Sequence, residues 1–334
     1  MTFSLDQKTD AVLHRVCGLI LSCDLPLPEL APVVAVEPNG TADIRVELSG
    51  RRVRHLRSIR WFKTGSPPSE ALWLSTGKIE GGYLLRFHDL ADFTVDAQGR
   101  EIVCCPSPGT PVGTLRHLLL DQVMPLVLTL HGRHVLHATT VQTPLGVCAF
   151  IGPTGVGKST LAASFLFAGY SVLSDDCLGL QEDSQRILAI PAYPGLRLWD
   201  DSLEAVCKHH HPSIPVAHYT SKRRPVLGNS PASFPTAPQP VARIYSLVRP
   251  DEQVASSPSI EPLSHRGAFV ELLASSYRLD TTDRTALVRQ FDFFERVVAE
   301  VPVHRLHLPT DFSALAASRE AVFADLQSSS CARR

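Results

Sequence analysis

One stretch constrains this chain more than any other, the pattern G-x-x-x-x-G-K-S between Gly152 and Ser159. The apolar run Val147 to Ile151 precedes it, and the helix-forming run Leu161 to Leu166 follows it. A strand, a glycine turn and a helix N-terminus in this order are the context of a phosphate-binding P-loop. The glycines let backbone N–H groups turn inward, and the helix adds the positive end of its dipole. The stretch predicts a binding site for a nucleoside triphosphate.

The side chains at the end of this loop have separate expected tasks. Lys158 can reach the β- and γ-phosphates, and the Ser159 hydroxyl can ligate Mg²⁺. A fortuitous glycine turn that carries Lys-Ser is the alternative, and the flanks on both sides argue against it. The predicted nucleotide-binding residues are Gly152, Pro153, Thr154, Gly155, Val156, Gly157, Lys158, Ser159 and Thr160.

Two adjacent acids, Asp175 and Asp176, follow the apolar run Tyr170 to Ser174. Asp175 lies 17 residues after Lys158, a distance that one helix and one returning strand fill. Both carboxylates are therefore expected beside the P-loop. We assign Asp175 as the acceptor of a hydroxyl proton and Asp176, with Ser159, as the Mg²⁺ ligand, although the two acids can exchange these roles. The alternative is an exposed Asp-Asp turn.

His137 is a further catalytic candidate, placed on an expected strand from His134 to Val141, ahead of the P-loop strand. A lone histidine on a strand is more often a packing residue. Its value as a candidate comes from its position before the P-loop.

Composition excludes several classes of function. A net charge of −1 gives no electrostatic reason to expect nucleic acid or an anionic membrane as a partner. We find no apolar run long enough for a membrane-spanning helix and no signal-peptide pattern at the N-terminus. The 8 cysteines contain no C-x-x-C pair, which favours a reduced, cytoplasmic protein.

The 334 residues suggest two domains. Short apolar runs broken by glycine steps predict an antiparallel, β-rich N-terminal domain over residues 1–113. A helical pattern that Pro125 kinks or splits is expected to form a bridge at 114–132. A P-loop domain is then expected over 133–330. Within it we expect helices at about 265–278, 283–299 and 312–326, with a strand at 301–308.

Three other groups carry weaker signals. Lys222, Arg223 and Arg224 form either a phosphate or acidic-peptide clamp or a solvated basic loop. Trp199 and Tyr193 are interpreted as core residues rather than nucleotide-stacking groups. A zinc site is disfavoured because the spacing matches no standard ligand pattern; its candidate ligands are Cys207, His209, His210, His211 and His218.

The set formed by His137, Gly-Pro-Thr-Gly-Val-Gly-Lys-Ser and Leu-Ser-Asp-Asp resembles the HPr kinase/phosphorylase family over about residues 133 to 190. In that family a strand histidine precedes the P-loop, and an Asp-Asp pair closes the next strand. The resemblance implies an α/β fold with an atypical P-loop kinase domain, related to phosphoenolpyruvate carboxykinase, behind a smaller β-rich domain. It carries the family's functional positions onto His137, Gly152 to Ser159, Asp175 and Asp176.

The segments Leu-His-Ala-Thr-Thr-Val and Tyr-Pro-Gly-Leu-Arg-Leu-Trp are similar to the HPr-kinase-like relatives found beside peptide natural-product genes, lasso peptides among them. This resemblance implies an ATP- and Mg²⁺-dependent kinase that phosphorylates a serine of a peptide or small protein, such as a precursor peptide. A kinase for a small metabolite and a nucleotide-binding regulatory module without turnover are the alternatives. The acceptor, any phosphorolysis and any homo-oligomer stay open.

Overall fold

The computed structural model shows a mixed α/β protein. It describes residues 12–30, 42–50, 59–65, 73–184, 186–193, 195–207, 211–226, 235, 237–248 and 257–332. The chain divides into two compact units. The first consists of Met1–Arg133, Ala217–Tyr219 and Arg278–Arg284, and the second of His134–Val216, Thr220–Tyr277 and Thr285–Arg334. The functional division into 1–113, 114–132 and 133–330 stays a prediction.

The first unit is built on one 8-stranded sheet in the order β1-β2-β3-β8-β7-β6-β5-β4. Its strands are β1 (Val12–Val16), β2 (Leu19–Cys23), β3 (Ile44–Leu48), β4 (Arg60–Gly65), β5 (Leu74–Ile79), β6 (Gly82–Phe87), β7 (Ala91–Asp96) and β8 (Glu101–Pro106). Hairpins make β4 to β8 antiparallel. The sheet is mixed, however, because β3 runs parallel to both β2 and β8.

A helical run follows this sheet within the first unit. It consists of α1 (Val112–His117), the π-helical η1 (Leu118–Val123) and α2 (Met124–Leu130). Pro125 stands in the first turn of α2, directly after the π-helical η1. The run is helical from Val112 to Leu130, and the change from π-helix to α-helix falls just before this proline; a kink or split there stays a prediction.

The second unit contains a 9-stranded sheet in the order β12-β10-β11-β17-β14-β13-β9, with β19 beside β17 and β18 beside β19. Its strands are β9 (His134–Leu136), β10 (Ala138–Thr143), β11 (Gly146–Ile151), β12 (Ser171–Ser174), β13 (Leu178–Asp183), β14 (Arg186–Ile190), β17 (Gln239–Val248), β18 (Ser259–Pro262) and β19 (Val303–His307). A separate small hairpin joins β15 (Ser213–Pro215) to β16 (Arg223–Pro225).

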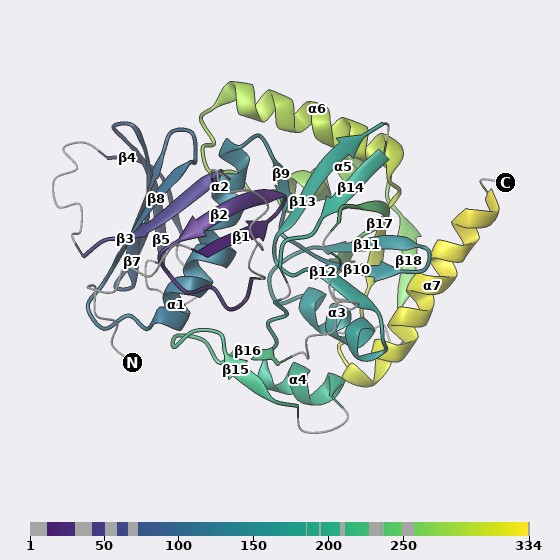
Figure 1. Cartoon of the computed structure of the whole chain (residues 1–334). Helices are drawn as coiled ribbons and strands as arrows, with labels where there is room; N and C mark the ends of the chain where they lie inside the picture. The colour runs from purple at the N-terminus through teal and green to yellow at the C-terminus, as the bar shows by residue number, and fades with distance from the viewer. Residues whose placement is uncertain are drawn as a thin grey trace. The chain divides into compact units, whose positions relative to one another are not determined.

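Helices cover both faces of this sheet (Figure 1). They are α3 (Lys158–Phe167), α4 (Asp200–Val206), α5 (His265–Ala274), α6 (Arg284–Glu300), the 3₁₀ turn η3 (Phe312–Ala314) and α7 (Leu315–Ala332). Successive side chains of a strand point to opposite faces of its sheet, so the residues of β11 contact helices on both faces. Val147, Ala149 and Ile151 pack with α5 and α6, whereas Cys148 and Phe150 pack with α3 and α7.

Most elements expected in the C-terminal part are present, with one correction. The single strand expected from His134 to Val141 is broken at His137 into β9 and β10. β9 pairs with β13, whereas β10 pairs with β11 and β12. The backbone N–H of His137 donates instead to the carbonyl of Ser275 at 2.7 Å. His137 therefore lies at a break between strands and not within one.

Among the described residues, no helix combines the length and the apolar character that crossing a bilayer demands.

Candidate functional site

The glycine turn, residues 152–157, connects β11 to the first residue of α3. Gly152 has φ +133° and Gly157 has φ +112°, a region that side chains with a Cβ rarely adopt. A Cβ on Gly152 would lie 2.8 Å from the carbonyl oxygen of Leu247. Both positions therefore need glycine, and the turn places Lys158 at the start of α3.

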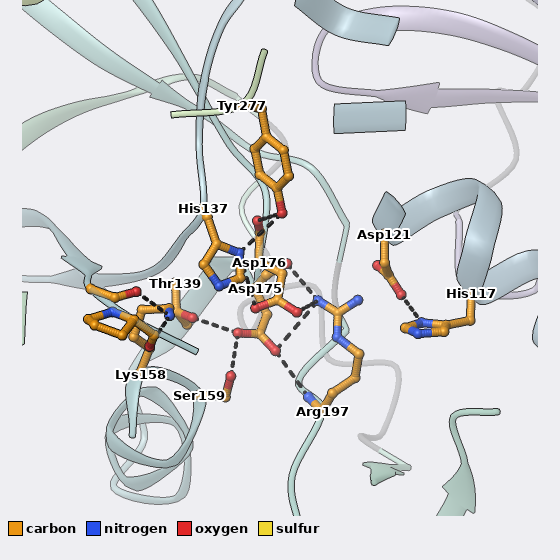
Figure 2. A network of polar contacts seen from close by, with 12 residues as sticks. His117, Asp121, His137, Thr139, Lys158, Ser159, Asp175, Asp176, Arg197 and Tyr277 are labelled. Carbon is orange, nitrogen blue, oxygen red and sulfur yellow. Dashed lines mark hydrogen bonds and ion pairs between the residues drawn. The ribbon is translucent and has the colours of Figure 1, made fainter. Parts of the chain in front are cut away.

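Lys158 has its ammonium group inside this turn (Figure 2). Its Nζ donates to the carbonyl oxygens of Gly152 at 2.8 Å and Pro153 at 3.0 Å. Burial lowers the pKa of Lys158, and the charge of Lys222 acts in the same sense, whereas Asp176 and Asp175 raise it. The turn thus holds a nearly buried positive charge.

A cavity of about 400 Å³ opens beside the turn. Its wall combines the glycine turn and the start of α3 with parts of five other segments. The lining residues are His137, residues 154–160, Asp176, residues 197–199, Asp201, Ser202, Lys222, residues 308–312, Ala314, Leu315 and Ser318. Its volume lies in the range of sites that bind small molecules.

Asp175 is buried behind this wall and is held on both carboxylate oxygens. Oδ1 accepts hydrogen bonds from the hydroxyls of Thr139 at 2.6 Å and Ser159 at 2.8 Å. Oδ2 accepts one from the backbone N–H of Arg197 at 3.0 Å. Burial and the charge of Asp176 raise the pKa of Asp175, while Arg197 and the two hydroxyls act in the opposite direction. Asp175 therefore ties α3 to the end of β12.

Asp176, in contrast, lines the cavity and has a side chain that is 21% exposed. Its backbone has φ +64°, a left-handed conformation that aspartate adopts more readily than most residues. The carboxylate lies 3.3 Å from Nη2 of Arg197 and 3.8 Å from Nδ1 of His137. An uncommon backbone conformation at a cavity wall is a feature that clusters at functional sites.

His137 also lines the cavity, and its imidazole is hydrogen-bonded to Tyr277. Nδ1 of His137 lies 3.1 Å from the Tyr277 hydroxyl, which also donates to the backbone carbonyl of Asp176. Burial lowers the pKa of His137, with opposition from the charge of Asp176. Burial thus favours the neutral imidazole, and the Asp176 carboxylate lies beside it (Figure 2).

Arg197 is a buried cation at the centre of this network, 1% exposed. Its Nη2 donates to the backbone carbonyl of Asp175 at 2.8 Å, and its Nη1 donates to the Tyr193 hydroxyl at 3.0 Å. Ion pairs with Asp175 and Asp176 offset the cost of burying the guanidinium. Arg197 is also one of the residues that line the cavity.

The structure brings the predicted site residues together around one cavity, although their roles stay predictions. His137, Asp176 and residues 154–160 line it, whereas Gly152 and Pro153 support the turn and Asp175 lies behind the wall.

Trp199 requires a correction, because it was expected in the core and is 46% exposed. Trp199 precedes the first residue of α4 and is one of the residues that line the cavity, whereas Tyr193 is buried as expected.

The basic residues and the zinc-ligand candidates suggested by the sequence lie in different places. Of the three basic residues, Lys222 lines the cavity, while Arg223 is held in β16 through Ser213. His209 and His210 lie outside the described residues. Within the described part of the chain, no three His, Cys, Asp or Glu side chains form a metal-binding group.

Sequence reasoning missed Arg197, Tyr277 and the cavity segment 308–318. Arg197 stood in a quoted motif but carried no sign of its contact with the acid pair. Tyr277 and the 308–318 segment are more than 100 residues from the glycine turn and reach it through tertiary packing alone.

Comparison with known proteins adds little to this geometry. No protein-family model and no curated protein sequence matches the chain. Among solved structures, the chain is similar to the Hpr(Ser) kinase/phosphatase from Coxiella burnetii, with 11% sequence identity and a TM-score of 0.31. The match covers 58% of this chain and 98% of that chain. A match at this level carries no functional weight, so function is inferred below from the site itself.

Proposed function

We propose that this protein is a kinase that transfers the γ-phosphate of ATP to a hydroxyl group, with a serine of a peptide or small protein as acceptor. The observation that carries the proposal is the pair of adjacent carboxylates with different surroundings. One is buried and bound to Ser159 at the start of α3, and the other faces the cavity beside His137. Phosphoryl transfer needs this combination of a phosphate-binding loop, a metal-side oxygen set and a group that orients the attacking hydroxyl.

The surroundings of Asp175 and Asp176 favour the reverse of the roles that the sequence suggested, with the proton acceptor and the metal-side carboxylate exchanged. Asp175 already accepts hydrogen bonds on both oxygens, which leaves it suited to hold Ser159 and Arg197 in place. Asp176 lines the cavity, where an acceptor hydroxyl can approach it. We therefore assign Asp176 as the proton acceptor and Asp175 as the metal-side carboxylate.

The reaction then balances as follows. The acceptor hydroxyl oxygen forms a bond to the γ-phosphorus, and the bond from that phosphorus to the β,γ-bridging oxygen breaks, so ADP leaves. The hydroxyl proton passes to Asp176, and His137 lies next to this carboxylate. Lys158 and Arg197 put positive charge beside the transferring phosphoryl group, where negative charge is spread over its oxygens.

The oxygen atoms near the turn fit Mg²⁺. Ser159 is one of the residues that line the cavity, and its hydroxyl donates to the Asp175 carboxylate at 2.8 Å; hard oxygen ligands of this kind suit Mg²⁺. When bound with the nucleotide, Mg²⁺ neutralises charge on the phosphates.

The serine acceptor rests on the resemblance of the motifs and not on the geometry. The assigned site serves equally a kinase for a small metabolite, and the experiment must separate the two. We would incubate the protein with γ-labelled ATP and Mg²⁺, and add either serine-containing peptides or a set of hydroxyl-bearing metabolites. Matched peptides with serine replaced by alanine serve as the control.

We expect phosphoserine in the serine peptides and no label in the alanine peptides. Label in metabolites alone would make the protein a metabolite kinase. ATP binding without transfer to any acceptor or to water would leave a nucleotide-binding regulatory module and refute the kinase.

A further inference from the structure

Two exposed aromatic residues, Trp199 and Phe312, are among those that line the cavity. Trp199 is 46% exposed and Phe312 is 39% exposed, and both contribute to the cavity wall. They come from neighbouring elements, because Trp199 caps α4 and Phe312 begins η3, and α4 is in contact with η3. Large aromatic side chains left open to solvent inside a cavity are suited to a planar ligand.

The order of the strands in the sheet shows on which side of the glycine turn Phe312 lies. β12, β11, β17 and β19 run in one direction, so their carboxyl ends meet at one edge of the sheet. The acid pair leaves the sheet after β12, on one side of β11, and the segment with Phe312 follows β19, on the other side. The glycine turn after β11 thus has the acid pair and Phe312 on opposite sides.

The hydrogen bonds of Ser159 and Thr160, at the start of α3, agree with this arrangement. Ser159 donates to Asp175 on the acid side. The hydroxyl of the next residue, Thr160, donates to Oγ of Ser202 in α4 at 3.2 Å, on the aromatic side. A triphosphate in the glycine turn with its γ-phosphate at the acid pair therefore extends its nucleoside toward α4 and η3.

We propose that Trp199 and Phe312 form the nucleobase subsite of this protein, with the base held by stacking on these rings. The proposal rests on the proposed function, which supplies the direction of the triphosphate. Lys222 belongs to the same wall, with its Nζ 5.3 Å from the centroid of the Trp199 ring. This contact orients the indole and places a positive charge beside the Trp199 ring.

The test compares ATP with inorganic tripolyphosphate, which has the phosphates but no base. Dissociation constants for both would be measured by calorimetry with Mg²⁺ for wild type, Trp199→Ala and Phe312→Ala. Phe291→Ala is the matched control, because Phe291 is an aromatic residue of the same unit, is 43% exposed and does not line the cavity. Circular dichroism checks that each variant is folded.

We expect each cavity variant to bind ATP about fivefold more weakly or worse, equal to about 1 kcal/mol at 1.4 kcal/mol per tenfold, the lower end of base stacking on an aromatic residue. Tripolyphosphate affinity should stay within about twofold, and Phe291→Ala should behave as wild type. ATP affinity unchanged in both cavity variants would overturn the subsite and leave the kinase standing. Equal losses for both ligands would also overturn it, since the rings would then act through the phosphates.

Two further results separate this inference from the proposed function. Wild type that binds neither ATP nor tripolyphosphate would refute the phosphate site itself, and the subsite with it. Unchanged ATP affinity together with a raised KM for a peptide acceptor would assign the two rings to the acceptor and overturn the base assignment.

Discussion

Replacement of Asp175 and Asp176 by asparagine, one at a time, is expected to damage the protein in two different ways. The buried carboxylate of Asp175 accepts from Ser159, Thr139 and the N–H of Arg197. An amide at this position has one oxygen, and its NH₂ group faces at least one donor. The substitution also removes a negative charge 3.6 Å from the buried Arg197 guanidinium.

The magnitude follows from this environment. Removing one member of a buried ion pair typically costs about 3–5 kcal/mol. Asp176 remains 3.3 Å from the same guanidinium, so we expect the lower end, about 3 kcal/mol, for Asp175→Asn. For Asp176→Asn we expect less than about 1 kcal/mol, because the side chain is partly exposed and asparagine tolerates a left-handed backbone.

The expected effects on catalysis are the reverse. Loss of a positioned general base lowers rates by about 10²–10⁴-fold, so Asp176→Asn should bind ATP like wild type and lose transfer by that factor. Urea unfolding gives the free energy of unfolding, calorimetry gives nucleotide affinity, and ADP formation gives the rate. A stable Asp175→Asn variant, or an Asp176→Asn variant with the wild-type rate, would refute the assigned roles.

Other perturbations test separate parts of the site and its sheet. Lys158→Ala should lower nucleotide turnover by about 100-fold or more with less than about 1 kcal/mol change in unfolding free energy, measured on one sample; wild-type turnover would contradict the loop assignment. Chelation with EDTA should stop turnover, and Mg²⁺ or Mn²⁺ without zinc should restore it, so undiminished activity in EDTA would exclude the metal role. Gly152→Ala should cost about 1–3 kcal/mol and weaken ATP binding, because its Cβ meets the Leu247 carbonyl in a positive-φ conformation; a variant as stable as wild type would show that the turn does not need glycine. Burial, with Arg296 and Arg289, lowers the pKa of His134 from 6.5 to about 4, so the folded protein resists a proton that the unfolded chain accepts. The free energy of unfolding should therefore fall by about 1–2 kcal/mol between pH 7 and pH 5 in wild type. It should fall by less in His134→Phe, which keeps a ring against Phe293. Urea unfolding measures both, and an equal fall in wild type and variant would refute this.

The sequence located the centre of the candidate site because local rules determine it. The glycine spacing predicted a turn with positive φ angles, and the structure has them at Gly152, Gly155 and Gly157. The distance from Lys158 to Asp175 predicted a helix and a returning strand, and α3 and β12 fill it. These features depend on residues close together in the chain.

Features set by tertiary contacts were beyond sequence reasoning. The break at His137 depends on a hydrogen bond to Ser275, and the contact with Tyr277 comes from the same distant segment. Trp199 was expected in the core because aromatic residues in apolar runs usually pack there. Its exposure follows from its place at the N-terminus of α4, on the cavity wall.

The most direct test of the central claim is ADP formation from ATP and Mg²⁺, measured with and without serine peptides. Background hydrolysis needs no knowledge of the acceptor, because water then takes the place of the hydroxyl. We predict that wild type forms ADP, faster when an acceptor peptide is present, and that Asp176→Asn forms ADP about 10²–10⁴-fold more slowly while it still binds ATP. Wild type that binds ATP but forms no ADP under any of these conditions, or an Asp176→Asn variant that turns over equally fast, would contradict a phosphoryl-transfer site at this cavity.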